Sequence, residues 1–157
     1  MKIMMGVDME GITGIVSREH VARDGRLYGI GRELMVGDIN AAVAGLLDAG
    51  VDEVVVWDNH ASGINAPLPG LHPGATYCRG SGANRVRWVG LDDSFDGLIL
   101  LGYHAKAGTL HAVLEHTMSS ASWCRLAVNG REIGEAGIDG ALAAMERFAK
   151  EARPGSV

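Results

Sequence analysis

Short, largely apolar runs that each end in polar residues are the feature that most restricts the fold of this sequence. Three such runs, at residues 2–7, 54–57 and 98–101, have the length of a strand and are far too short to span a bilayer. Apolar side chains at successive positions are typical of strands that are buried on both faces of a parallel sheet. Because helical patterns separate the runs, we predict an α/β fold with a mainly parallel central sheet flanked by helices.

Two stretches have the spacing of amphipathic helices. The first predicted helix spans residues 33–49 and ends before Gly50, and the second spans residues 138–152 and ends before Pro154. In both, apolar side chains recur on one side at intervals of three or four residues. These stripes consist of Met35, Ile39, Val43, Leu46 and Leu47 in the first helix and of Ile138, Leu142, Met145 and Phe148 in the second.

Shorter elements are expected between and after these stretches. Residues 12–30 have no regular period, so we expect an irregular segment between the first strand and the first helix. Residues 76–79 and 86–89 have the character of short strands. Residues 123–128 are followed by an Asn-Gly pair at 129–130, which predicts a β-hairpin.

Composition and charge restrict the class of protein and its partners. The 157 residues are 47% hydrophobic and 21% charged, which is typical of one soluble domain over residues 1–157. A net charge of −5 argues against nucleic acid as the main partner. The first residues do not follow the plan of a signal peptide, and no membrane span is expected. Cys78 and Cys124 form no CxxC motif and are expected as reduced thiols in the cytoplasm.

Polar residues of the kind that bind metals follow three predicted strands. Asp8 and Glu10 follow the first strand, His60 follows the second, and His104 follows the third. The carboxyl ends of parallel strands form the crevice in which α/β proteins bind ligands, so these side chains are expected at one edge of the sheet. Two carboxylates and two imidazoles suit Zn²⁺ or Mn²⁺ and do not suit a soft, thiolate-bound metal.

Each of these residues also has a structural explanation when it is taken alone. An acidic pair after a strand is often part of a solvated loop, and a lone histidine is often a hydrogen-bonded structural residue. Glu135 lies near the start of the second predicted helix, where a negative charge interacts favourably with the helix dipole. Three strand ends with the same chemistry nevertheless favour a metal site.

A phosphatase of the haloacid-dehalogenase type is the rival reading of the first strand end. The segment from Asp8 to Thr13 is superficially similar to the aspartate motif of that superfamily, with Asp8 as nucleophile. That chemistry requires a second aspartate where Glu10 stands, and it leaves His60 and His104 without a role. The phosphatase is therefore the weaker hypothesis.

Five motifs in order resemble those of the zinc-dependent D-aminopeptidase family of dipeptide-transport operons. They are GVDMEGI at 6–12, WDNH at 57–60, GLDD at 90–93, LGYHA at 101–105 and NGREIGE at 129–135. The resemblance is nearly collinear from Met1 to about Gly140. It implies hydrolysis of short peptides that begin with a D-amino acid, with two zinc ions per chain that activate water and the scissile carbonyl.

The resemblance also implies roles for individual residues. The implied metal ligands are Asp8, Glu10, His60, His104 and Glu135, with Asp8 bridging the two ions. His116 matches the histidine proposed as nucleophile or base in the family, and His111 is the alternative for that role. Family members assemble into ring-like decamers, so a homo-oligomer is expected.

The sequence departs from the family pattern in two ways. The first motif begins with serine in the family and with Gly6 here, which removes a hydroxyl. Family members are also considerably longer, so the chain is expected to lack their C-terminal half. All the implied ligands lie in the part that is present. A metal-binding relative that is impaired in catalysis and acts through assembly is therefore the alternative function.

Overall fold

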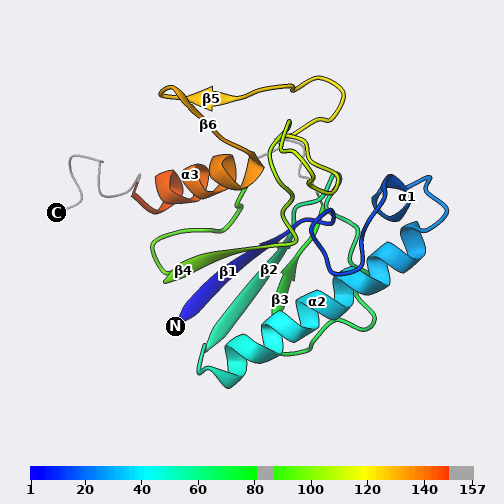
Figure 1. Ribbon diagram of the computed structural model, residues 1–157. Coiled ribbons are helices and arrows are strands. Elements are labelled where there is room, and N and C mark those ends of the chain that lie inside the picture. The colour runs from blue at the N-terminus through cyan, green and yellow to red at the C-terminus, as the bar shows by residue number, and fades with distance from the viewer. Residues whose placement is uncertain (81–86, 149–157) are drawn as a thin grey trace.

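A parallel sheet with helices on both faces forms the centre of the computed structural model, which describes residues 1–80 and 87–148 (Figure 1). Its strands are β1 (Lys2–Val7), β2 (Glu53–Asp58), β3 (Thr76–Cys78) and β4 (Gly97–Leu101). They lie in the order β3-β2-β1-β4, and every neighbouring pair is parallel. The predicted α/β class and parallel sheet are confirmed.

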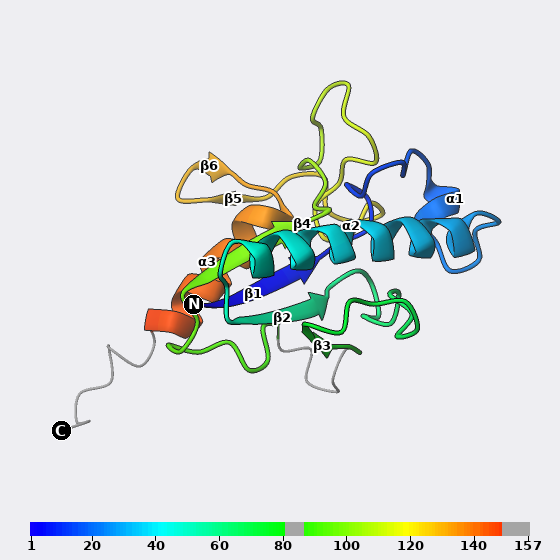
Figure 2. The same cartoon turned by 90° about the horizontal axis from the view of Figure 1, so that it is seen from below.

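Two long helices cover opposite faces of this sheet (Figures 1 and 2). The helices are α1 (Arg18–Val21), α2 (Tyr28–Asp48) and α3 (Glu135–Phe148). The predicted stripe of α2 is confirmed, because Met35, Ile39 and Val43 are fully buried in one core with alternate residues of β1 and β2. Ala143 of α3 packs on the other face with Met4. Within the described residues, no helix combines the length and apolar character needed to cross a bilayer.

The first part of the chain is more regular than its pattern predicts. Residues 12–30 contain α1 and the start of α2, which begins at Tyr28 instead of residue 33. Glycines at 29 and 31 weaken the helical signal there, because glycine is a poor helix former. Packing against α1 supports this first turn of α2 in spite of its composition.

Three predictions in the second half need correction. Residues 87–89 lie in turns, and Trp88 has a φ of 60°, which no strand allows; residue 86 lies outside the described residues. The hairpin is confirmed but short, with β5 (Ala127–Val128) antiparallel to β6 (Arg131–Glu132). Helix α3 begins three residues earlier than predicted, and residues 149–152 lie outside the described part.

The buried face of α3 also differs from the prediction. Leu142 and Met145, from the predicted apolar stripe, are 37% and 66% exposed. Over residues 135–145 of α3, the buried ones are Glu135, Asp139 and Ala143, which recur every four positions. This face is partly polar because its first turns cover the polar ends of the strands instead of an apolar surface.

The strand order places a ligand crevice beside β1. The chain leaves β1 towards β2 and β3 on one side, and it returns to β4 on the other side. Such a reversal of direction opens a crevice at the carboxyl ends of the two strands that flank it. The residues that follow β1 and β4 therefore lie at the position where open α/β sheets bind ligands.

Candidate metal site

Asp8 and Glu10 are buried at the end of β1 because the chain folds back against the residues that follow β4. The backbone N–H of Gly11 donates a hydrogen bond to the carbonyl of Gly102 at 2.7 Å. A Cβ atom at Gly11 would lie 2.6 Å from the carbonyl oxygen of Tyr103, so only glycine allows this approach. The close contact holds the backbone directly after Asp8 and Glu10 against the segment that follows β4.

The imidazole of His60 joins the two carboxylates. Its Nδ1 lies 3.0 Å from Asp8 Oδ1 and 3.1 Å from Glu10 Oε2, and its Nε2 lies 3.1 Å from the carbonyl of Val21. Burial opposes the charged form of this imidazole, but the two carboxylates outweigh burial and raise the pKa of His60 to about 10. In the same way burial opposes ionisation of Glu10, yet His60 lowers the pKa of Glu10 to about 2. For Asp8, burial prevails and raises the pKa.

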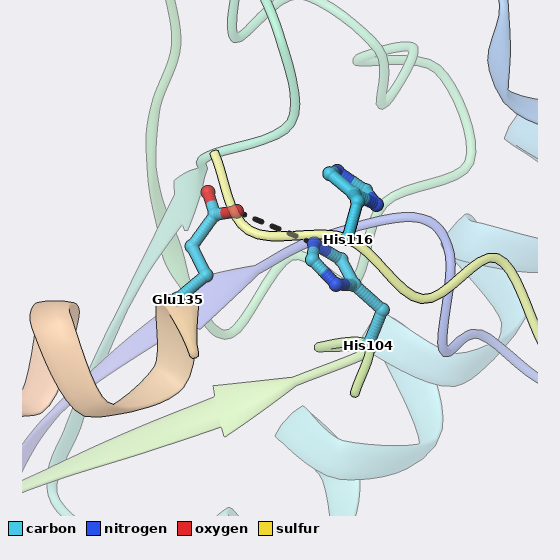
Figure 3. Close-up of side chains that lie close together, drawn as sticks. All are labelled: His104, His116 and Glu135. Carbon is cyan, nitrogen blue, oxygen red and sulfur yellow. Dashed lines mark ion pairs between the residues drawn. The ribbon is translucent and has the colours of Figure 1, made fainter. Parts of the chain in front are cut away.

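His104 faces carboxylates from two different elements. Its Nε2 lies 3.4 Å from Asp8 Oδ2 and 3.3 Å from Glu135 Oε2, the latter drawn as a dashed line in Figure 3. Its Nδ1 lies 3.0 Å from the carbonyl of Ala105, which fixes Nδ1 as the donor. Burial opposes the charged form of His104, while the Glu135 carboxylate raises its pKa to about 9.

The Nε2 atom of His104 provides the test of whether this cluster suits a metal. It is buried and makes no hydrogen bond, although two carboxylate oxygens are near it. A divalent cation between an imidazole nitrogen and carboxylate oxygens would satisfy all three atoms. Nitrogen and carboxylate oxygen are also the donors that zinc accepts. The residues present therefore fit the metal that the resemblance implies.

The described residues contain two groups with the spacing of metal ligands. One group is Asp8, Glu10 and His104, and the other is His104, His116 and Glu135; in each, the ligand atoms lie within 4.8 Å of one another. The two groups share His104.

His116 lies directly against His104. Their ring centroids are 3.6 Å apart and their planes differ by 15°, so the imidazoles are stacked (Figure 3). His116 Nδ1 lies 2.9 Å from the carbonyl of Leu114 and can donate a hydrogen bond to it. This leaves the second ring nitrogen, Nε2, available to another group. His111, the alternative from the sequence, is exposed and belongs to neither group.

Glu135 is the first residue of α3, and both of its oxygens are held. Oε2 accepts a hydrogen bond from the backbone N–H of Met118 at 3.0 Å, and Oε1 accepts one from Arg87 Nη2 at 3.4 Å. Burial raises the pKa of Glu135, but His104 and these donors outweigh burial and lower it. Sequence reasoning missed Arg87, because a contact over 48 residues leaves no local pattern.

The cluster opens on a cleft that could admit a small ligand. A cavity of about 610 Å³ is lined by Glu10, His60, His116 and Glu135, with Arg18 and Arg23 at the same opening. This volume is within the range of small-molecule sites. The structure thus brings together all six residues that the sequence analysis selected: Asp8, Glu10, His60, His104, His116 and Glu135.

Comparisons with known proteins found D-aminopeptidases that are similar to this chain in sequence and in fold. The chain is 36% identical to a D-aminopeptidase of Bacillus subtilis over 143 residues, which are 91% of this chain and 52% of that protein. Among solved structures, a match with a TM-score of 0.83 and 34% identity is described as a Zn-dependent D-aminopeptidase, DppA, from Bacillus subtilis, a self-compartmentalizing protease. The match covers 97% of this chain and 59% of that one.

The chain therefore spans about half the length of the curated relative that it matches. The predicted resemblance to the N-terminal portion of this family is confirmed by these relatives. A family model described as D-aminopeptidase matches residues 1–147, which is most of the sequence. By this match, and by the fold that it shares with a solved relative, the chain belongs to the D-aminopeptidase family.

Proposed function

We propose that this chain acts as a zinc-dependent aminopeptidase on short peptides that begin with a D-amino acid. The observation that carries the proposal is the buried Nε2 of His104, which has no hydrogen bond and faces the carboxylates of Asp8 and Glu135. Two relatives, a D-aminopeptidase and a Zn-dependent D-aminopeptidase of Bacillus subtilis, support zinc as the metal and an N-terminal D-residue as the substrate feature.

Five side chains would hold the metal, which we propose as two zinc ions per chain. They are Asp8, Glu10, His60, His104 and Glu135. The two oxygens of Asp8 face different imidazoles, Oδ1 towards His60 and Oδ2 towards His104, and this supports a bridging role. When bound, the zinc pair supplies Lewis acidity that lowers the pKa of water and polarises a peptide carbonyl.

His116 would move the proton during hydrolysis. Its ring lines the cleft, and its Nδ1 is tied to the carbonyl of Leu114, so Nε2 is the nitrogen available to a substrate. An imidazole nitrogen can both accept a proton and return it to the leaving amine. The stack on His104 holds this ring beside the proposed metal ligands.

We further propose that the chain acts in the cytoplasm as a homo-oligomer, with the decamer of the family as the expected form. The solved relative is described as self-compartmentalizing, which supports assembly. Cys78 and Cys124 are free thiols, in agreement with a reducing compartment. Sedimentation of the zinc-loaded chain tests the oligomer directly, and a monomer would contradict it.

A dipeptide assay with metal analysis tests the enzymatic proposal. The chain is purified with Zn²⁺ and assayed on D-Ala-D-Ala and L-Ala-L-Ala, beside an Asp8→Ala variant. About two zinc ions per chain and turnover of the D-dipeptide that Asp8→Ala loses are the expected results. Zinc without turnover selects the impaired metal-binding relative. Less than one zinc per chain, unchanged in Asp8→Ala, contradicts the site itself.

The phosphatase hypothesis predicts a different result in a parallel assay. It requires release of phosphate from p-nitrophenyl phosphate with Mg²⁺ and without Zn²⁺. Family membership and the inclusion of His60 and His104 in the cluster favour the peptidase. We therefore expect no release of phosphate under either metal.

A further inference from the structure

A buried carboxylate that is not itself a proposed ligand lies directly behind the proposed metal ligands. Asp139 is fully buried on α3, one turn after Glu135. Its Oδ2 accepts hydrogen bonds from Tyr103 Oη at 2.6 Å, from Arg87 Nη2 at 2.6 Å and from Asn59 Nδ2 at 2.9 Å. Arg87 Nε also lies 2.5 Å from Asp139 Oδ1, which makes this an ion pair through both oxygens.

The partners of Asp139 are next to proposed ligands in the chain. Asn59 immediately precedes His60, and Tyr103 immediately precedes His104. Asn59 Nδ2 also donates to Tyr103 Oη at 2.6 Å, so the segments that follow β2 and β4 are joined to each other as well.

The third connection runs from Asp139 to Glu135 through Arg87. The guanidinium of Arg87 binds Asp139 and also donates to Glu135 Oε1 at 3.4 Å. This contact leaves Glu135 Oε2 directed towards His104. One carboxylate therefore reaches all three of the segments that carry His60, His104 and Glu135.

We propose that Asp139 is a positioning residue for the metal site, and that together with Arg87 it holds the three ligand-bearing segments in place. The inference rests on the proposed function, because positioning has meaning only where a metal binds. A buried ion pair seldom stabilises a fold more than apolar residues of similar size would. Partners behind the ligands, by contrast, commonly set metal affinity by fixing the orientation of each ligand.

Zinc affinity of the full chain tests this role, with Asp139→Asn as the first variant. The asparagine keeps the size of the side chain and removes its charge, so Arg87 loses its ion pair with Asp139 and keeps only the longer one with Glu135. We expect zinc affinity, measured by competition with a chelator, to fall about tenfold or more. The visible absorption spectrum of the Co²⁺-loaded variant is expected to change, because ligand geometry determines that spectrum.

A destabilised control separates positioning from stability. Val43→Ala removes volume from the core beside α2, on the opposite face of the sheet from Asp139. This control is expected to lower the melting temperature while it keeps the zinc affinity and Co²⁺ spectrum of the wild type. Arg87→Met and the variant that combines it with Asp139→Asn complete a double-mutant cycle. The combined variant should lose less zinc affinity than the sum of the two single losses.

The outcomes distinguish this inference from the proposed function. If Asp139→Asn binds zinc within about twofold of the wild type with the same Co²⁺ spectrum, the positioning role is wrong while the metal site stands. If Asp139→Asn does not fold, Tyr103→Phe takes its place under the same criteria, because it removes the hydrogen bonds of Tyr103 Oη with Asp139 and Asn59 and no charge. A wild-type chain that binds no zinc overturns the proposed function, and the inference with it.

Discussion

The imidazole of His116 stacks on that of His104, with ring centroids 3.6 Å apart and an angle of 15° between the ring planes. His104 is buried between Asp8 and Glu135, whereas His116 is half-buried and lines the cleft. The same contact thus joins a residue suited to hold a cation with a residue suited to meet a substrate. The two histidines should therefore respond differently to substitution.

Replacement of His116 by alanine should stop hydrolysis without emptying the site. We expect kcat on a D-dipeptide to fall by about 10²-fold or more, because general acid–base groups contribute factors of this order. Zinc content, measured on the same sample, should stay near that of the wild type. His111→Ala is the matched control, since His111 is exposed and lies outside both ligand groups. A loss of activity in the control instead would reverse the assignment.

Zinc should raise the thermal stability of the chain. Asp8, Glu10 and Glu135 are buried together, and a cation that binds only the folded state removes their mutual repulsion. At a free zinc concentration a hundred times the Kd, the expected stabilisation is about 2.7 kcal/mol for each site that zinc fills. Differential scanning fluorimetry with and without chelator measures it. An Asp8→Ala variant that gains as much as the wild type would show that the ion binds elsewhere.

Zinc binding should release protons at neutral pH. In the metal-free chain the pKa of His60 is raised to about 10 and that of His104 to about 9, so both imidazoles are charged at pH 7. An imidazole must be neutral to bind a metal, so we expect about two protons to leave as zinc enters. Protons thus compete with zinc, and the affinity should rise with pH until both histidines are neutral.

Calorimetry in buffers of different ionisation enthalpy counts these protons. The matched variant is His60→Asn, which should release about one proton fewer than the wild type at pH 7. Equal release from the two proteins would mean that His60 is neutral before zinc binds. In that case the contacts of His60 with Asp8 and Glu10 would be hydrogen bonds of a neutral imidazole and not ion pairs.

The parts of the site that follow strands could be predicted because their signals are local. An apolar run that stops at Asp8 or just before His60 marks the end of a parallel strand, and such ends gather at one edge of a sheet. The same reasoning placed His104 there. Glu135 could not be chosen from its surroundings alone, because a carboxylate at a helix start has an ordinary electrostatic explanation. Its role came from the resemblance.

The residues behind the site could not be predicted because their partners are distant in the chain. Asp139 bonds to Asn59 over 80 residues and to Arg87 over 52. The spacing of apolar residues in α3 predicts that these side chains are buried. The structure buries Asp139 instead. Which face of a helix is buried cannot be read from apolar spacing when the surface that it covers is polar.

Gly6 shows how a departure from the family pattern is accommodated. A Cβ atom at Gly6 would clash with Cη2 of Trp88, which is 2% exposed and fills the space that a side chain at position 6 would occupy. Trp88 is held there by its indole N–H, which donates to the backbone carbonyl of Asp139 at 3.1 Å. The indole and a side chain at position 6 therefore exclude each other.

Restoring the serine should accordingly destabilise this chain. We expect Gly6→Ser to lower the free energy of unfolding by about 1–3 kcal/mol, the usual cost of overpacking a core. In a Trp88→Leu background the same substitution should cost much less, because the smaller side chain leaves room for it. Gly37→Ala is the control, since Gly37 is exposed on α2 with no atom near its missing Cβ, and alanine there should stabilise the helix. Urea unfolding of the four variants measures these differences, and an equal cost of Gly6→Ser in both backgrounds would show that Trp88 is not what excludes the serine.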